Sequence, residues 1–279
     1  MTIIREKIMF KDIIIGQYVP GKSVLHRLDP KIKIVLTLVY IVMLFLIHSP
    51  VSYAAFAVIT VVLVLISRIN LKFFLKGLRP MLFIIIFTAV INLLLTPGTA
   101  ALSVPVFKWT FSVTYEGIRA AVTMFYRLIF LVTGTSLLTL TTTPLMLTDG
   151  IEKLLSPLTI IKVPAHEIAM MMTIAIRFIP TLAEETDKIQ KAQTARGADF
   201  SSKNLIKRVK SMIPLLVPLF VSAFRRADEL ATAMDARCYN GGKNRTRLHE
   251  SKIGRNDIIC AIIYIAVCAI VLTIQTIQY

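Results

Sequence analysis

Five long apolar runs separate polar segments along the chain, and their lengths predict helices that cross a membrane. Four runs fill the first half and one closes the chain, at roughly 32–47, 51–67, 81–96, 120–142 and 258–274. Several have only about 16 or 17 residues, or about 25 Å of helix, which is short for about 30 Å of hydrocarbon. Flanking residues must therefore extend these helices, or the bilayer must thin locally. The pattern predicts an all-α polytopic membrane protein with about five transmembrane helices.

The segment between the fourth and fifth runs is polar and contains two helical patterns. In the second pattern, apolar residues follow i, i+3, i+4 and i+7 spacing at Phe220, Ala223, Phe224, Ala227, Leu230, Ala231, Met234 and Cys238. Arg225 and Arg226 occupy the other faces of that helix. The first pattern is less regular, with an apolar line at Ile174, Phe178, Leu182, Ile189 and Ala192. Alanines on both lines would let the two helices cross closely.

This organisation divides the chain into three parts. Residues 1–143 hold the N-terminal segment and four membrane helices, residues 144–257 hold the two polar helices, and residues 258–279 hold the last membrane helix. Within the middle part, two moderately apolar stretches at 168–179 and 212–224 are shorter than a membrane span. We expect interfacial or buried helices there, although a hydropathy profile could count one of them as a sixth span.

Composition and charge support a membrane protein and set its orientation. The chain is 56% hydrophobic, and its 32 Lys and Arg residues outnumber 16 Asp and Glu residues. Such an excess in a soluble protein would suggest nucleic-acid binding, but cytoplasmic loops of membrane proteins also accumulate Lys and Arg. The basic residues gather in 1–33 and 68–79, whereas the turn at 48–50 has none. We therefore predict a plasma-membrane protein that binds no nucleic acid, with the N-terminus and residues 144–257 in the cytoplasm.

Two similar hexads close the two polar helical patterns. Residues 192–197 read Ala-Gln-Thr-Ala-Arg-Gly, and residues 233–238 read Ala-Met-Asp-Ala-Arg-Cys. One arginine near a helix C-terminus needs no special explanation, since it interacts favourably with the helix dipole. A duplicated arginine flanked by alanines indicates docking instead, because a guanidinium with little bulk beside it can enter a groove and meet a carboxylate in bidentate fashion. The candidate docking residues are Ala195, Arg196, Gly197, Ala236, Arg237 and Cys238.

The sequence gives little support to catalysis, metal binding or ion-coupled transport. It contains none of the HExxH, GxSxG or Walker A motifs, and its histidines are scattered. No Asp or Glu lies centrally in an apolar run, whereas ion-coupled transporters usually need midplane carboxylates. Arg127 lies within the fourth run, where we favour an interfacial anchor over a transport pathway. We predict a chain with no catalytic residues and no metal site.

Three stretches of the chain resemble the EcfT family, the transmembrane subunits of energy-coupling factor transporters, which are a branch of the ABC transporters. The string Gly16-Gln17-Tyr18-Val19-Pro20-Gly21-Lys22-Ser23-Val24-Leu25-His26-Arg27-Leu28-Asp29-Pro30 is similar to the segment before that family's first span. Residues 177–180 with 192–197, and residues 218–230 with 236–239, are similar to its two coupling helices. The Gly-Gln-Tyr motif looks like the shared-module type rather than the dedicated cobalt or nickel type.

The resemblance implies a scaffold without catalytic activity that binds no cofactor itself. Two partner ABC ATPases would hold ATP and Mg²⁺, and each would receive one coupling helix. A separate substrate-binding S component would carry a vitamin or similar micronutrient. Cys238 departs from the glycine usual at that position, and its Cβ makes a left-handed backbone costly, so the two helix ends are expected to differ. The alternative is a self-contained channel or secondary transporter with a regulatory cytoplasmic segment.

Overall fold

The structure is a computed structural model that describes residues 18–106, 109–198, 200, 204–241 and 253–277. Gly16 and Gln17 of the N-terminal motif lie outside these residues. The elements in chain order are α2 (Val24–Arg27), α3 (Pro30–Leu46), α4 (Pro50–Ser67), α5 (Leu71–Leu78), α6 (Leu82–Leu95), β1 (Ala100–Val106), β2 (Trp109–Thr114), α7 (Tyr115–Thr141), α8 (Pro144–Leu155), the 3-10 helix η1 (Ser156–Ile161), α9 (Ala165–Ala195), α10 (Leu205–Ala236) and α11 (Arg255–Ile277).

Contacts divide the described residues into two compact units. The membrane unit lies within residues 17–150 and 251–279, and the helix-pair unit lies within residues 151–250. Helix α8 runs from the first unit into the second, since the division falls between Gly150 and Ile151. The boundaries expected at 143 and 257 remain a prediction from the sequence.

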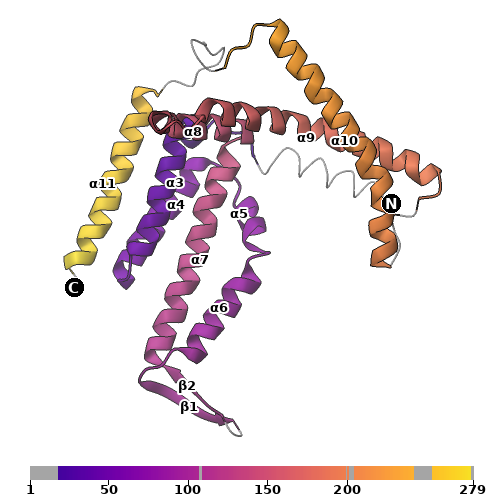
Figure 1. Ribbon diagram of the computed structural model, residues 1–279. Coiled ribbons are helices and arrows are strands. Elements are labelled where there is room, and N and C mark those ends of the chain that lie inside the picture. Colours follow the sequence, from indigo (N-terminus) through magenta and orange to yellow (C-terminus); the bar gives the residue numbers. More distant parts are fainter. Residues whose placement is uncertain (1–17, 107–108, 199, 201–203, 242–252, 278–279) are drawn as a thin grey trace. The chain divides into compact units, whose positions relative to one another are not determined.

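The membrane unit is a bundle in which α3, α4, α7 and α11 pack against one another (Figure 1). Helices α5 and α6 pack against α7. Short polar side chains fix where several of these helices begin. Asp29 Oδ1 accepts a hydrogen bond from the amide of Lys31 at 2.9 Å, ahead of Pro30 in the first turn of α3. Thr114 Oγ1 accepts from the amide of Gly117 at 3.0 Å at the start of α7.

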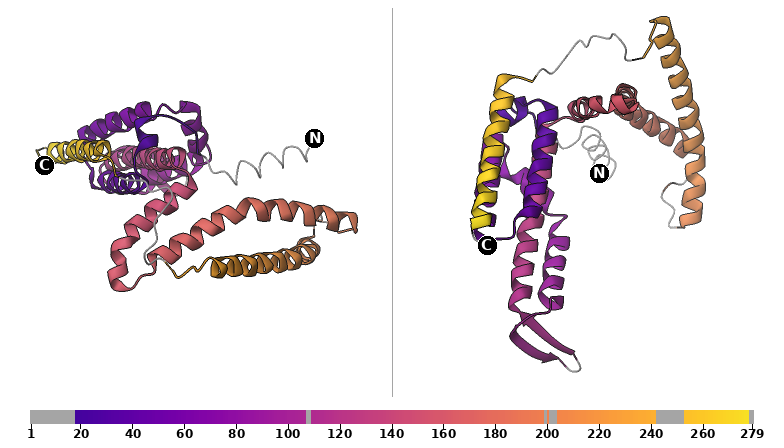
Figure 2. Two further views of the ribbon diagram at one scale, coloured as in Figure 1. Left: turned by 90° about the horizontal axis from the view of Figure 1, so that it is seen from above. Right: turned by 60° about the vertical axis from the view of Figure 1, so that its left-hand side comes forward.

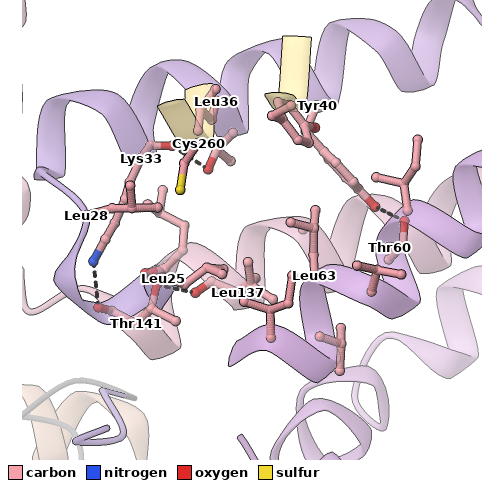
Figure 3. Close-up of a pocket in the computed structure, with 18 of the residues that line it drawn as sticks. Leu25, Leu28, Lys33, Leu36, Tyr40, Thr60, Leu63, Leu137, Thr141 and Cys260 are labelled. Carbon is pink, nitrogen blue, oxygen red and sulfur yellow. Dashed lines mark hydrogen bonds between the residues drawn. The ribbon is translucent and has the colours of Figure 1, made fainter. Parts of the chain in front are cut away.

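The core of the membrane unit is built around Tyr40 of α3. Its ring lies 4.7 Å from that of Phe56, centroid to centroid. Its hydroxyl is 3.0 Å from Thr60 Oγ1 (Figure 3). The same hydroxyl donates to the carbonyl of Phe130 at 3.1 Å. A Cβ at Gly134 would lie only 2.4 Å from Tyr40 Cε1. Glycine at this position of α7 therefore lets the ring pack closely against the helix.

Lys33, only 6% exposed, joins three parts of the membrane unit. Its Nζ donates to the carbonyls of His26 and Thr141, at 3.2 and 3.0 Å, and to Thr142 Oγ1 at 3.4 Å. The ammonium thus caps the C-terminal end of α7, where a cation is favourable. Lys33 also lies beside a cavity of about 520 Å³ between the helices (Figure 3). Since its described lining is otherwise uncharged and the amine is engaged, the cavity presents an apolar surface.

The all-α polytopic class is confirmed, but fewer helices than expected are long and apolar enough to cross a membrane. Within the described residues these are α4, α7 and α11. A fourth results if α5 and α6, bent by 58°, form one span. Helix α3 forms where predicted but has 17 residues. By length and composition, three or four helices of the described residues could therefore cross a membrane, and neither α9 nor α10 adds to them. The expected total of about five, which includes α3, remains a prediction. The predicted orientation remains a prediction.

One small sheet was not expected from the sequence. Strands β1 and β2 pair antiparallel, with Val106 opposite Trp109 and Ala100 opposite Thr114. The hairpin fills the low-charge connection between α6 and α7, to which the hydropathy pattern assigned no element. It pairs two strands only and leaves the helical class unchanged.

Candidate docking site

Helices α9 and α10 form an antiparallel pair in the helix-pair unit (Figure 2). Glu185 of α9 contacts Ser222 of α10, and Gln193, eight residues later, contacts Pro214, eight residues earlier. Because a later residue of α9 contacts an earlier residue of α10, the two helices run antiparallel. Their C-terminal ends, which carry the two hexads, therefore point away from each other.

A carboxylate joins the middles of the two helices. Glu185 Oε1 accepts from Ser222 Oγ at 2.5 Å, and Oε2 accepts from Arg226 Nη2 at 2.7 Å. Ser222 and Arg226 are one helical turn apart, so both reach the same acceptor. The side chains of Glu185 and Arg226 are 22% and 30% exposed, which makes this ion pair less screened than a surface pair.

A second cross-helix bond uses a carbonyl that a proline leaves without its usual donor. Pro218 has no N–H, so it cannot donate to the carbonyl of Pro214 four residues earlier. The side-chain amide of Gln193 donates to that carbonyl at 3.3 Å. Helix α10 continues through both prolines, and α9 continues through Pro180. Gln193 belongs to the first hexad, so this hexad also helps to hold the pair together.

The first hexad ends α9 in a Schellman motif. Arg196 is the C-cap, and Gly197 follows with φ of +87°. The amide of Gly197 donates to the carbonyl of Thr194, and the amide of Ala198 donates to that of Gln193, both at 3.0 Å. Two carbonyls at the end of the helix are thereby satisfied.

The second hexad ends α10 with the same backbone geometry. Arg237 is the C-cap, and Cys238 follows with φ of +55°. The amide of Cys238 donates to the carbonyl of Asp235 at 2.9 Å, and the amide of Tyr239 donates to that of Met234 at 3.0 Å. The expectation that cysteine would make the two ends differ is therefore wrong for the backbone. The two hydrogen bonds hold Cys238 in the left-handed region despite its Cβ.

Both arginines are available to a partner. Arg196 and Arg237 are exposed, and neither guanidinium makes an ion pair or hydrogen bond with another residue that the structure describes. Ala192 and Ala233 precede them by one helical turn and are exposed too, as are Ala195 and Ala236. Each end thus presents a guanidinium beside small side chains. This arrangement suits bidentate binding of a carboxylate.

The face of α10 that packs against α9 differs from the one that the spacing predicted. Arg226, which the spacing placed on an outer face, lies on the packed face next to α9. Phe220 and Phe224, placed on the packed line, are 61% and 69% exposed. On α9 the predicted line is partly buried at Ile174, Phe178, Leu182 and Ile189. Glu185 falls on this line by spacing, and a lone carboxylate there is the signal that could have predicted the ion pair.

Arg127 of the membrane unit has local partners near the α3–α4 turn. Its Nη2 donates to Tyr53 Oη at 3.0 Å and to the carbonyl of Ile47 at 3.5 Å. Its guanidinium lies 5.4 Å from the centre of the Phe45 ring. These contacts hold the C-terminal end of α3 against α7.

Comparisons with known proteins agree with these features. A family described as CbiQ, cobalt transport protein, matches residues 21–248. A protein of Clostridium kluyveri is 55% identical over 265 residues, which cover 95% of each chain. One of Ruminiclostridium cellulolyticum is 56% identical, over 90% of this chain and 92% of its own. One of Thermosediminibacter oceani is 53% identical, over 89% and 92%.

These three relatives share one name, energy-coupling factor transporter transmembrane protein EcfT. The match extends over both units, including both hexads. The apolar helices and this relationship together identify a multi-pass membrane subunit of a transporter. The chain therefore belongs to the EcfT family of energy-coupling factor transporter transmembrane proteins, as its motifs indicated.

Proposed function

We propose that this chain couples ATP hydrolysis by two partner ABC ATPases to uptake of a vitamin or similar micronutrient through a separate S component. The chain itself is not catalytic, and ATP and Mg²⁺ bind to the ATPases. The relatives' name supports a transporter subunit, and the assembly with two ATPases and an S component is our proposal.

The observation that carries this proposal is the pair of matched helix ends. Arg196 and Arg237 are both exposed C-caps, each followed by a residue in the left-handed conformation. A single solvated arginine would need no partner. Here two arginines are C-caps with the same backbone geometry, and they lie at opposite ends of one antiparallel helix pair. This arrangement fits two partners that each recognise an arginine at a helix end.

The chemistry of each contact follows from the guanidinium and its small neighbours. An acidic side chain in a groove of each ATPase would accept two parallel hydrogen bonds from the arginine. Ala192 and Ala233, one turn earlier, leave room for the wall of the groove. Lysine would keep the charge at either position but lose the bidentate geometry.

The exposed apolar face of α10 supports a second contact, with the S component. Val217, Phe220, Val221 and Phe224 are all exposed and lie within two helical turns. Four contiguous exposed apolar side chains on one helix face are typical of a protein interface. When the ATPases close, they would move the two arginine-bearing ends. The Glu185–Arg226 pair would make the helices move together, and the S component on α10 would tip to release its cargo.

Co-purification with the ATPases from the native membrane, combined with substrate uptake, tests this proposal. We expect Arg196→Glu and Arg237→Glu each to weaken ATPase recovery, and the double variant to abolish uptake. Arg→Lys variants should retain part of both. Lys188→Glu makes the same charge change on an exposed position of α9, so it should leave both measurements unchanged.

Two outcomes would count against the proposal. Normal ATPase recovery and uptake with the double variant would exclude the docking role of the arginines. Substrate movement by the purified chain alone in vesicles would instead support a self-contained transporter. Because the S component selects the substrate here, the chain without its partners should transport nothing.

A further inference from the structure

Helix α5 is a short amphipathic helix of the membrane unit that the proposed function does not use. It begins at Leu71, with three residues between it and the end of α4, and Asn70 Oδ1 accepts from the amide of Lys72 at 3.1 Å. Since α4 is long and apolar enough to span a membrane, a helix that starts so soon after it lies at the membrane surface.

One edge of α5 is fixed to the bundle. Phe74 is buried and packs with Ile69 and Leu140. A Cβ at Gly77, one turn later, would lie 3.5 Å from Ser136 Oγ of α7. These contacts set which faces of α5 point outward.

The outward face carries a stripe of cations. Lys72, Lys76 and Arg79 follow i, i+4 and i+7 spacing, and all three are exposed. Arg68, at the end of α4, adds a fourth exposed cation, and no acidic residue occurs between 68 and 79. None of the four makes an ion pair with another described residue. By spacing, the stripe lies opposite Phe74.

Exposed apolar side chains lie directly beside this stripe. Leu71 and Leu75 are one turn apart, and both are 58% exposed. A helix face in contact with water alone would not be expected to carry two exposed leucines beside its cations. Apolar side chains that meet acyl chains, next to cations that meet headgroups, are the pattern of a helix lying in the membrane interface.

We propose that the Lys72–Lys76–Arg79 face of α5 binds anionic phospholipid headgroups while Leu71 and Leu75 insert beside them. Four uncompensated cations complement a negatively charged lipid surface, and each adds to the attraction. In a span, Lys72 and Lys76 would face hydrocarbon at high cost, so α5 lies along the surface rather than forming the first part of a broken span with α6.

Lipid-specific fluorescence quenching tests this proposal in the full-length chain, independently of its partners and its orientation. The chain's three cysteines are replaced by alanine, Leu75→Cys is labelled with a fluorophore, and the protein is placed in nanodiscs. Brominated phosphatidylglycerol and brominated phosphatidylcholine are compared at the same mole fraction, about one tenth. One cation at the surface multiplies local occupancy by anionic lipid about fivefold, so we expect the anionic quencher to be enriched about fivefold or more.

Two comparisons make the result specific. Replacing all four cations by glutamine (Arg68→Gln, Lys72→Gln, Lys76→Gln and Arg79→Gln) should bring the enrichment close to one, whereas Lys72→Arg with Lys76→Arg should keep it. A label at Leu46→Cys is exposed at the α3–α4 turn, where 46–51 contains no Lys or Arg and the nearby Arg127 is engaged by Tyr53 and Ile47. It should show a clearly smaller preference for the anionic quencher than the label at Leu75→Cys. Equal quenching by both lipids at Leu75 would overturn the proposal and leave an acidic protein surface as the occupant. Enrichment that survives the quadruple Gln variant would overturn it too, because these cations would then not be its cause.

Discussion

Glu185 of α9 and Arg226 of α10 touch at 2.7 Å and are 41 positions apart, the same offset that separates Arg196 from Arg237. The contact therefore joins positions that correspond to each other when the two hexads are aligned. Each arginine C-cap lies 11 residues beyond its member of the pair, or about 16 Å along the helix. The carboxylate–guanidinium pair thus sits midway between the two candidate docking ends.

Removing the Glu185 carboxylate should loosen the helix pair. Glu185→Ala leaves Arg226 and Ser222 without their shared acceptor, and we expect a loss of about 1–3 kcal/mol in the free energy of unfolding in detergent. A double-mutant cycle with Arg226→Ala should give a coupling energy of about 1–2 kcal/mol. The exposed Arg225–Glu229 pair, 3.9 Å apart and 75% and 69% exposed, provides the control. Its coupling should stay below about 0.5 kcal/mol, and equal coupling for both pairs would contradict the interpretation.

The bond from Gln193 to Pro214 should matter only while residue 218 is proline. Gln193→Leu removes one hydrogen bond and should cost about 1 kcal/mol of stability in detergent. In a Pro218→Ala background the carbonyl regains a helical donor, so the same substitution should cost clearly less. Gln190→Leu, exposed on the same helix, should be within about 0.5 kcal/mol of neutral. A cost for Gln193→Leu that does not depend on residue 218 would show that the bond has another role.

A Cβ should be unfavourable at both helix ends, so adding one at Gly197 and removing one at Cys238 should have opposite effects. Gly197→Ala places a Cβ at φ of +87° where nothing lies within 4 Å, so any cost comes from the backbone alone. We expect about 1 kcal/mol, seen as amide exchange about fivefold faster at Gly197 and Ala198. Cys238→Gly should slow exchange at Tyr239 by a similar factor. Cys238→Ala keeps the Cβ and should change little, and faster exchange in the glycine variant would contradict the assignment of strain.

Gly134 should tolerate no side chain while Tyr40 is present. A methyl group at 2.4 Å from the ring forces Tyr40 or α7 to move, and we expect Gly134→Ala to cost about 1–3 kcal/mol in detergent. Gly77→Ala adds a methyl group at an ordinary distance of 3.5 Å and should be neutral or slightly stabilising. Titration with sodium dodecyl sulfate would measure both variants. Equal effects would mean that helix propensity, rather than the ring contact, decides the outcome.

Much of the fold follows from the sequence because local rules agree with one another. Asp29 before Pro30 and Asn204 before Leu205 each cap the first turn of a helix in a region where the sequence pattern predicts one. Asn70 caps α5, a short helix that the pattern did not predict. The hairpin between α6 and α7 escaped prediction because its strands pair only with each other. The hydropathy pattern of two such short strands does not stand out between two apolar helices.

The candidate site could be found from the sequence, but its internal geometry could not. The repeated hexad in the sequence identified Arg196 and Arg237, and their docking role remains a prediction. Arg225 and Arg226 are neighbours that differ by about 100° around the helix, so only the actual crossing decides which one packs against the other helix. The backbone at Cys238 depends on bonds to Met234 and Asp235 that outweigh the preference of the residue itself.

The place of the Glu185–Arg226 contact has a consequence for symmetry. A half-turn about an axis through this contact exchanges α9 with α10 and carries Arg196 approximately onto Arg237, with Gly197 onto Cys238. Under the proposed docking, two subunits that bind the ends in the same way would be related by that same half-turn and would face each other across it. Successive subunits of a row, related by translation, could not both make the contact, so the proposal implies a partner dimer with twofold or near-twofold symmetry.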